Sequence, residues 1–478
     1  MATTVRRDNS RAYSRGGVRW NPGFWPEWTQ TIDLDHIGDI AHRELHLDNE
    51  EGCIASRLGH GTLNQLYLLK TDSGQEYVFR ASLPVCSVLK TQSEVATMKL
   101  VRSRTSIPIP EIISYGLDSS EMGYEWILMT KIPGRDLGIA GMGLSLDAKR
   151  ALVRQLAKYQ AGLFALRFSG IGNLVTIAEP SGESKKSSSD PSPKAYTVGQ
   201  CCTYEFFMLD HLSSGIPKGP FDNSAQWLTA LLNIFIRDQD RLFREGGTSV
   251  SLAEQDPEDV QQEFWNYAHG TSEEACFRKQ VAERLKALVQ KVFPVDDGSA
   301  EQTMLFHHDL HTGNVMVDEE ACQLPASLTY QWRQSSTPHT GIGEETIVQE
   351  PAEPKTGEDD FWEYLTEEEQ ALLREEFLAT MRVICPEWIE IREKSVLQTN
   401  LGIAVSAIGN PHHTTAIEQW CNAVEKGKFG DDLARRLYVG QKRPRPREEP
   451  PTANELALAE TLWEDWKETV EYYRPSSS

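Results

Sequence analysis

The 478-residue sequence predicts an α+β chain with two lobes, a small strand-rich lobe followed by a larger helical lobe. Three observations predict this class. Between residues 50 and 132, short runs of β-branched and aromatic residues alternate with turn residues. From residue 133 to residue 440, apolar residues recur mainly at helical spacing behind good N-capping residues. The dipeptide Pro133-Gly134 interrupts the chain where the two patterns meet.

The strand-rich lobe is expected to hold a hairpin, a helix and two further strands. Thr71 to Gly74 supply the turn of the hairpin, between two apolar runs. A rough apolar stripe predicts a helix over residues 91–104, and Pro108 lies beyond its end. The expected strands cover residues 66–69, 77–81, 112–115 and 126–129.

The helical lobe is expected to begin with a helix over residues 146–167, because Ser145 is a good N-cap and apolar residues recur behind it. Two later helices begin at capping boxes, Thr271 with Glu274 and Thr366 with Glu369. The helix after the first box is expected to run to about residue 291.

Four segments are expected to lie outside these elements. Residues 179–194 and 333–360 are polar and contain Pro or Gly, and are expected to be mobile loops. Residues 441–478 are expected to form a stiff Pro-rich basic linker and a C-terminal helix. That linker is either a plain spacer or a ligand for SH3-type or nuclear-import proteins. Residues 1–49 are an N-terminal extension.

The N-terminal extension carries five arginines before Trp20, with Asp8 as the only acid among them. It lacks the apolar core of a secretory signal. A solvated basic tail and a mitochondrial presequence are the two interpretations that remain. We expect a cytoplasmic location, with a mitochondrial one as the alternative.

The charge of the chain limits its partners. Lys plus Arg number 48 and Asp plus Glu number 70, so the net charge is -22. Phosphate backbones require clustered cations, and a membrane helix requires a long apolar run that the chain lacks. We therefore expect neither a nucleic-acid nor a membrane partner. Residues 301–400 hold 21 acids and 6 bases, which as a hypothesis favours a cationic acceptor.

The strongest chemical signal lies between His307 and Asp318. This segment contains the pattern His-x-Asp-x-x-x-x-Asn, followed by an apolar run. Phosphoryl transfer needs a carboxylate to orient and deprotonate an acceptor hydroxyl, and oxygen ligands for Mg²⁺. Asp309 suits the first role and Asn314 the second. A polar turn before a buried strand is the alternative interpretation.

Two further features of the strand-rich lobe suit a nucleotide. Gly59 and Gly61 lie between strands, where backbone amides can approach phosphates. Arg80 on the return strand of the hairpin, paired with Glu94 on the following helix, can hold phosphates, with part of that role left to Lys90. A hairpin turn and a surface ion pair are the structural alternatives.

The strand that runs from Glu125 to Thr130 leads into the extended segment before Gly134. Backbone groups at such a strand end, around Met129 and Thr130, can meet the edge of an adenine ring. By itself this pattern is only that of a buried strand.

The ordered set of motifs resembles the aminoglycoside phosphotransferase (phosphotransferase enzyme) family, and its fungal members in particular. The similarity covers residues 50–170 and 300–330 and extends loosely to the C-terminal helical part. That part is also similar to proteins named for altered inheritance of mitochondria. The resemblance implies a protein-kinase-like fold, with ATP and Mg²⁺ as cofactors and a small-molecule acceptor as partner. The roles that it implies are a catalytic base at Asp309, a metal ligand at Asn314, a phosphate-binding pair at Arg80 and Glu94, and a nucleotide loop at Gly59 and Gly61.

One feature departs from the family. A second metal-binding Asp usually follows the Asn on the next strand, within Ile-Asp-Trp. Here Ala321 to Pro325, which resembles the segment after that Asp, follows Glu320 directly. A strand and its Asp are therefore expected to be absent, through a skipped exon or true loss. Asp360-Phe361 is the nearest later match.

These features leave three hypotheses. The chain is an ATP-dependent phosphotransferase for a small-molecule hydroxyl, or a catalytically inactive kinase-like module that binds a nucleotide or a partner. A protein kinase is the third and weakest, because neither Asp-Phe-Gly nor Ala-Pro-Glu follows Asn314. Neither the acceptor nor the oligomeric state can be predicted from the sequence.

Overall fold

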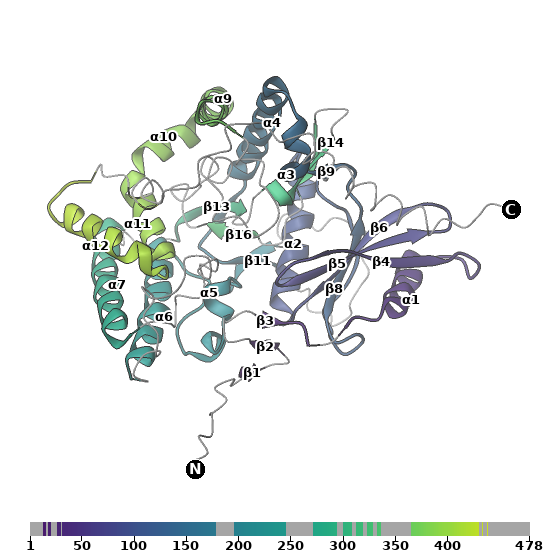
Figure 1. Ribbon diagram of the computed structural model, residues 1–478, viewed down its shortest axis with the longest axis horizontal. Helices are drawn as coiled ribbons and strands as arrows, with labels where there is room; N and C mark the ends of the chain where they lie inside the picture. The colour runs from purple at the N-terminus through teal and green to yellow at the C-terminus, as the bar shows by residue number, and fades with distance from the viewer. Residues whose placement is uncertain are drawn as a thin grey trace, which may run out of the picture.

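A computed structural model describes most of the chain. The described residues are 13–15, 18–20, 26–29, 31–177, 196–244, 271–293, 300–307, 312–318, 323–327, 332–335, 365–429, 433 and 437. A sheet with helices α1 and α2 forms one side of the molecule, and a larger group of helices forms the other (Figure 1). The predicted α+β class with a small strand-rich lobe and a larger helical lobe is thus confirmed.

The strand-rich lobe is built on one antiparallel sheet with the strand order β4-β5-β6-β8-β7. Each predicted strand lies in it, with bounds that extend by a few residues beyond the expected ones. β5 and β6 form the predicted hairpin, and β8 is inserted between β6 and β7. The strands are β4 (Cys53–His60), β5 (Asn64–Thr71), β6 (Glu76–Ser82), β7 (Ile112–Gly116) and β8 (Glu125–Thr130).

Helix α2 (Leu89–Arg104) is buried on several sides, which explains why its apolar stripe was only rough. One side packs on the sheet through Val95, Met98 and Val101. Polar residues of its first two turns are buried as well, among them Lys90, Thr91 and Glu94. A helix that is enclosed in this way needs internal partners for its polar side chains.

The expected solvated basic tail is wrong for part of the N-terminal extension. Residues around Trp20 form a three-stranded antiparallel sheet, and Val18 and Trp20 are buried in one apolar cluster with the main sheet. Helix α1 (Leu34–Leu45) covers the same sheet through Ile37 and Ile40. The many arginines of this segment led to the prediction of a solvated tail, although Val18 and Trp20 occupy alternate, buried positions of a strand. The strands are β1 (Tyr13–Arg15), β2 (Val18–Trp20) and β3 (Pro26–Glu27).

The helical lobe contains the predicted capped helices. Ser145 caps α4, and both predicted capping boxes form, at the starts of α7 and α9. The α-helices are α3 (Leu137–Ala140), α4 (Leu146–Ala165), α5 (Tyr204–Phe207), α6 (Ser224–Arg244), α7 (Ser272–Val292), α9 (Glu367–Ile384), α10 (Pro386–Lys394), α11 (Val396–Ala407) and α12 (Pro411–Glu425). The short 3-10 helices are η1 (Gly141–Gly143), η3 (His211–Ser213) and η6 (Thr312–Asn314).

Among the described residues of this lobe, three small sheets form, with the strand orders β10-β13-β16, β11-β12 and β15-β14-β9. The expected loop over 333–360 is wrong at its start, because residues 332–335 pair with β13 as strand β16. The rest of that loop, the loop over 179–194 and residues 441–478 lie outside the described residues. The strands are β9 (Arg135–Asp136), β10 (Arg167–Ser169), β11 (Asn173–Thr176), β12 (Tyr196–Gly199), β13 (Gln302–His307), β14 (Val315–Asp318), β15 (Gln323–Ser327) and β16 (Trp332–Ser335).

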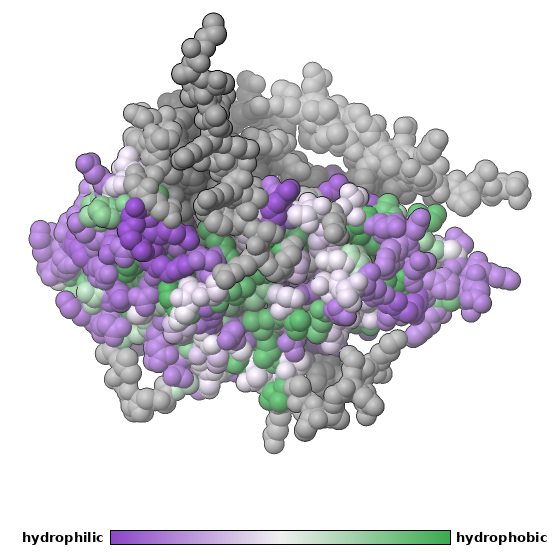
Figure 2. Space-filling view, turned by 90° about the horizontal axis from the view of Figure 1, so that it is seen from below, coloured by the Kyte–Doolittle hydropathy of each residue, from purple (hydrophilic) through white to green (hydrophobic). Residues whose placement is uncertain are grey.

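An apolar cluster joins the two lobes. It contains Val78 of β6 and Met129 of β8 together with Leu163 of α4 and Leu305 of β13. Burial of these side chains holds β13, the strand that precedes Asp309 in the sequence, against the main sheet. On the face shown in Figure 2, hydrophobic residues lie in small groups among hydrophilic ones. Within the described ranges, none of the helices has the length and apolar composition needed to cross a bilayer.

Candidate functional site

The predicted pair of Arg80 and Glu94 forms inside the strand-rich lobe. Arg80 lies on β6 and Glu94 on the second turn of α2, and the Arg80 guanidinium donates through Nη2 to Glu94 Oε2. The side chains are only 1% and 6% exposed, so the surface ion pair considered above is wrong. Because the pair is buried, removing either partner would leave an uncompensated charge in the interior and would lower the free energy of unfolding.

Lys90 joins the same carboxylate one helical turn earlier. Its Nζ lies 3.1 Å from Glu94 Oε1, and the side chain is 5% exposed. Lys90 Nζ also donates to Asn64 Oδ1 over 3.0 Å and to Ser82 Oγ over 3.4 Å. The cluster therefore places two cationic groups on one carboxylate, beside neutral acceptors. Such cations are the groups that phosphate oxygens bind.

Asn64 and Ser82 were not found from the sequence. They lie directly opposite each other in the register of β5 and β6, and Ser82 Oγ donates to Asn64 Oδ1 over 2.7 Å. Only the strand register reveals this pairing, because 18 residues separate the two positions. The one signal in the sequence was that a polar residue begins the first strand of the hairpin and another ends the second strand.

Glu125 is a third residue whose role sequence reasoning missed. Its side chain lies at the start of α2, where Oε1 accepts from Val88 N over 2.6 Å and from Ser87 Oγ over 2.9 Å. Val88 provides no side-chain cap of its own. A carboxylate there compensates the positive end of the helix dipole and holds the helix that carries Lys90 and Glu94.

Gly59 lies near the end of β4, and Gly61 lies in the turn between β4 and β5. A Cβ at either position would meet protein atoms only at ordinary contact distances, 3.7 Å at Gly59 and 3.5 Å at Gly61. Packing against the protein therefore does not require glycine there. Gly61 N donates to Asn64 O over 2.8 Å, so this amide is used within the hairpin. Gly61 could therefore help a phosphate site only by lacking a side chain, which leaves room for a ligand.

Met129 and Thr130 end strand β8, which lies between β6 and β7 in the sheet. Met129 is 2% exposed and belongs to the apolar cluster that joins the lobes. Thr130 N donates to Glu111 O over 2.9 Å, and Thr130 Oγ1 accepts from Glu111 N over 2.9 Å. The amide of Thr130 is thus used in a hydrogen bond to Glu111. An adenine edge would have to bind backbone groups that follow Thr130 in the chain.

Asn314 lies in the helical lobe, at the end of η6 and the start of β14. It is 4% exposed, and β14 pairs with β9, which directly follows the segment between the lobes. The predicted base Asp309 lies outside the described residues, as does Asp360. Of the nine predicted residues, the structure brings Arg80, Lys90 and Glu94 into direct contact.

The candidate ligands Asn314 and Asp309 are compatible with a Mg²⁺ ion that takes most of its other ligands from nucleotide phosphates and water. The described residues contain no cluster of three or more His, Cys, Asp and Glu side chains that could form a closed metal cage. Mg²⁺ usually takes one or two protein oxygens and completes its shell with phosphates and water. The side-chain oxygens of Asn314 and Asp309 are of that type.

The sheet, the buried cation cluster and the order of the motifs define a chain with a phosphotransferase-like fold. The chain belongs to the phosphotransferase enzyme family, whose profile matches residues 54–326. That range begins in β4 and ends in β15, so it includes both the Arg80 cluster and Asn314.

Two curated relatives are fungal proteins. A subtelomeric hrmA-associated cluster protein of Aspergillus fumigatus is 26% identical over 168 residues, which are 34% of this chain and 32% of that protein. Altered inheritance of mitochondria protein 9 of Candida tropicalis is 28% identical over 125 residues, 24% of this chain and 20% of that protein. The chain spans about a third or less of the length of these curated relatives.

Among solved structures, the chain is similar to a thermostable mutant of aminoglycoside phosphotransferase APH(4)-Ia in its apo form. The two are 13% identical, and the similarity covers 82% of this chain and 100% of that chain with a TM-score of 0.41.

Proposed function

We propose that this protein is an ATP-dependent phosphotransferase that acts on a hydroxyl group of a small molecule. The observation that carries the proposal is the buried cluster of Arg80, Lys90 and Glu94 in a chain of the phosphotransferase enzyme family. Two cations held by one carboxylate suit the phosphates of a nucleotide.

The proposed reaction moves one phosphoryl group. The acceptor hydroxyl gives its proton to Asp309, its oxygen bonds to the γ-phosphorus, and the bond to the β-phosphate oxygen breaks to release ADP. Arg80 and Lys90 orient the phosphates, and Glu94 holds both cations in place. Asn314 would be a protein ligand of Mg²⁺, which when bound neutralises charge on the phosphates.

The test is a phosphoryl-transfer assay with ATP and Mg²⁺ over a panel of small alcohols, including cationic ones. Asp309→Asn removes the proposed base and is expected to lower turnover by about a hundredfold or more. Equal silence of wild type and variant, or equal turnover by both, would contradict the proposal.

A second candidate is a nucleotide-binding protein without transfer activity. The segment from Val317 to Pro325 contains no Asp followed by Trp or Phe, which the family resemblance leads one to expect for the second metal ligand, and Asp318 lies too close to Asn314 to replace it easily. Without that carboxylate, Mg²⁺ loses its main anionic ligand. Mg²⁺-dependent turnover by the chain as given would contradict this candidate. Sequencing the transcript between the codons of Glu320 and Ala321 would reveal an in-frame Ile-Asp-Trp segment if an exon is missing.

A further inference from the structure

A buried hydrogen bond joins helix α2 to the helical lobe. Asn173, at the start of β11, donates through Nδ2 to Ser93 Oγ of α2 over 3.2 Å. The two residues are 6% and 1% exposed, so the bond forms away from water. Ser93 lies on α2 between Lys90 and Glu94. The helix that carries two members of the cation cluster is therefore bonded to the other lobe beside that cluster.

The amide of Asn173 is held in one orientation. Its Oδ1 accepts from Cys202 N over 2.7 Å, and a backbone N–H can only donate. Nδ2 must therefore face Ser93, whose hydroxyl oxygen accepts. One side chain thus binds α2 through its donor and the chain between β12 and α5 through its acceptor.

The backbone that carries Asn173 is fixed by the close pairing of β11 with β12. Asn173 lies opposite Gly199 in this pairing. A Cβ at Gly172 would lie 2.0 Å from Gly199 O, so the two strands can approach in this way only because residue 172 is glycine. The Asn173 side chain consequently extends from a backbone that has little freedom to move.

The same stretch of chain is bonded to β13, the strand that precedes Asp309 in the sequence. Thr303 Oγ1 of β13 donates to Gly170 O over 2.8 Å, and Thr303 is completely buried. β10, which ends at Ser169, pairs antiparallel with β13. The position of Asn173 is thereby linked to the strand that leads into the proposed catalytic segment.

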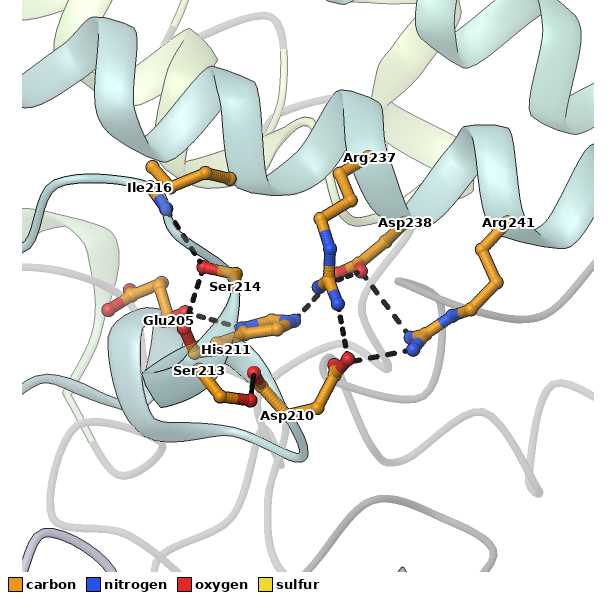
Figure 3. Close-up of polar contacts among 9 residues, drawn as sticks. All are labelled: Glu205, Asp210, His211, Ser213, Ser214, Ile216, Arg237, Asp238 and Arg241. Atoms are coloured by element: carbon orange, nitrogen blue, oxygen red, sulfur yellow. Dashed lines mark hydrogen bonds and ion pairs between the residues drawn. The ribbon is translucent and has the colours of Figure 1, made fainter.

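The chain beyond Cys202 is anchored on α6 (Figure 3). His211 Nε2 lies 2.8 Å from Asp238 Oδ2, and both side chains are at most 1% exposed. Arg237, the residue before Asp238 on α6, binds both Asp238 and Asp210. Through its bond to Cys202 N, the Asn173 side chain is thus connected to a segment that is itself fixed to the body of the helical lobe.

The start of α2 is held separately, from within the strand-rich lobe. Glu125 of β8 accepts from Val88 N at this end of the helix, and the contacts of the cation cluster also lie within this lobe. Loss of the bond at Ser93 would leave these contacts in place. Asn173 therefore does not build the cluster, but it determines where the cluster lies relative to the other lobe.

We propose that Asn173 is a positioning residue for phosphoryl transfer, which aligns the cation cluster with the helical lobe by holding α2 at Ser93. This inference rests on the proposed function, because transfer requires the phosphate-binding cations of one lobe to face the base and the metal ligand of the other. A phosphoryl group moves only when donor, acceptor and metal are aligned, and small errors of alignment slow the reaction.

Ser93→Ala tests the bond with the smallest change. It removes the acceptor on α2 and leaves the bond between Asn173 and Cys202. Because the cluster stays intact, the affinity for ATP should change by less than about twofold, whereas kcat should fall by about fivefold, the factor expected for one hydrogen bond. A general loss of stability would not separate kcat from ATP affinity in this way.

Thr97→Val is the matched control. Thr97 lies one turn after Ser93 on α2, is 1% exposed, and its hydroxyl has no hydrogen-bond partner in the described part of the chain. The substitution removes a buried hydroxyl from the same helix without breaking a bond, so kcat should not change. Amide hydrogen exchange gives a readout that does not depend on activity. Residues 89–97 should exchange about fivefold faster in Ser93→Ala and at the wild-type rate in Thr97→Val.

Asn173→Ala completes a double-mutant cycle. In that background, Ser93→Ala should have no further effect on kcat or on exchange. Unchanged kcat and exchange in Ser93→Ala, equal effects of Ser93→Ala and Thr97→Val, or additive effects in the double variant would overturn the proposal. A wild type without turnover would overturn the proposed function and the role in transfer with it. Faster exchange confined to the Ser93 and Asn173 variants would then still support this bond as the one that holds α2.

Discussion

At the scale of single residues, the buried contact of Arg80 with Glu94 is the most consequential feature. Arg80→Ala should lower the free energy of unfolding by about 3 kcal/mol, because it removes one of the two cations that compensate a buried carboxylate. Arg80→Lys keeps a cation and should cost less than Arg80→Ala. Urea denaturation followed by circular dichroism measures both.

A matched surface variant serves as the control for this prediction. Arg102 pairs with Glu111 over 3.0 Å, but the side chains are 48% and 59% exposed. Arg102→Ala should therefore cost less than about 1 kcal/mol. Equal losses for Arg80→Ala and Arg102→Ala would mean that burial of the Arg80 pair contributes nothing to stability.

The sequence was sufficient to predict some of these residues and not others. Arg80 and Glu94 were predictable because a cation on a strand and a carboxylate on the following helix form a pattern along the chain. Asn64, Ser82 and Glu125 were not predictable, because their roles depend on strand register and on which strand end lies beside the start of α2. The metal-ligand role of Asn314 and the base role of Asp309 stay predictions.

At the scale of elements, α4 and α9 are joined by an ion cluster that depends on pH. Glu376 of α9 lies 2.7 Å from Arg150 and 2.7 Å from Arg154, which are one turn apart on α4. Hydrogen bonds from Arg154 and Arg150 hold the pKa of Glu376 below its ordinary value of 4.5. The stabilisation is therefore fully present above pH 4.5 and is lost as the pH falls through the lowered pKa.

Glu376→Gln tests this interaction. It should reduce the free energy of unfolding by about 1 kcal/mol at pH 7, since both arginines are partly exposed. The difference from wild type should shrink as the pH is lowered below 4.5. Glu375→Gln is the neighbouring control, because Glu375 is 65% exposed and pairs with Arg382. A difference that does not change with pH would contradict the assignment.

The capping box of α7 provides a second prediction for an element. Thr271 Oγ1 accepts from Glu274 N over 3.2 Å, and Thr271 N donates to Glu274 Oε2 over 2.6 Å. Thr271→Ala removes one of these bonds and should cost about 1 kcal/mol, whereas Thr271→Ser should be nearly neutral. Thermal unfolding distinguishes the two variants. Equal melting temperatures would show that the cap is not needed.

Local signals explain which elements were predictable. α7 and α9 have capping boxes and α4 has a Ser cap, so their starts could be located from a few adjacent residues. The strands around Trp20 and β16 have weak local signals and depend on tertiary contacts. β16, for example, forms by pairing with β13. The paired residues His307 and Trp332 are 25 positions apart in the sequence, so no local pattern reveals this strand.

At the scale of the whole molecule, the two lobes share one apolar cluster, in which Met129 meets the same core as Leu305. This packing places the strand that leads to Asp309 beneath the end of the sheet where a nucleotide base is proposed to bind. The acidic charge lies mainly in residues 301–400, whereas the cations proposed for phosphate binding are buried in the other lobe. The proposed phosphate binding therefore depends on a local group of cations, while a cationic acceptor stays a hypothesis.

The central claim is that the buried cation cluster is part of a nucleotide site, and equilibrium binding of ATP tests it most directly. Isothermal titration of the full chain should give saturable binding of one ATP. Lys90→Met, which keeps an apolar stem but removes the charge, should weaken that binding by about tenfold while leaving unfolding cooperative. Absence of saturable ATP binding by the folded wild type, or unchanged affinity in Lys90→Met, would contradict the account.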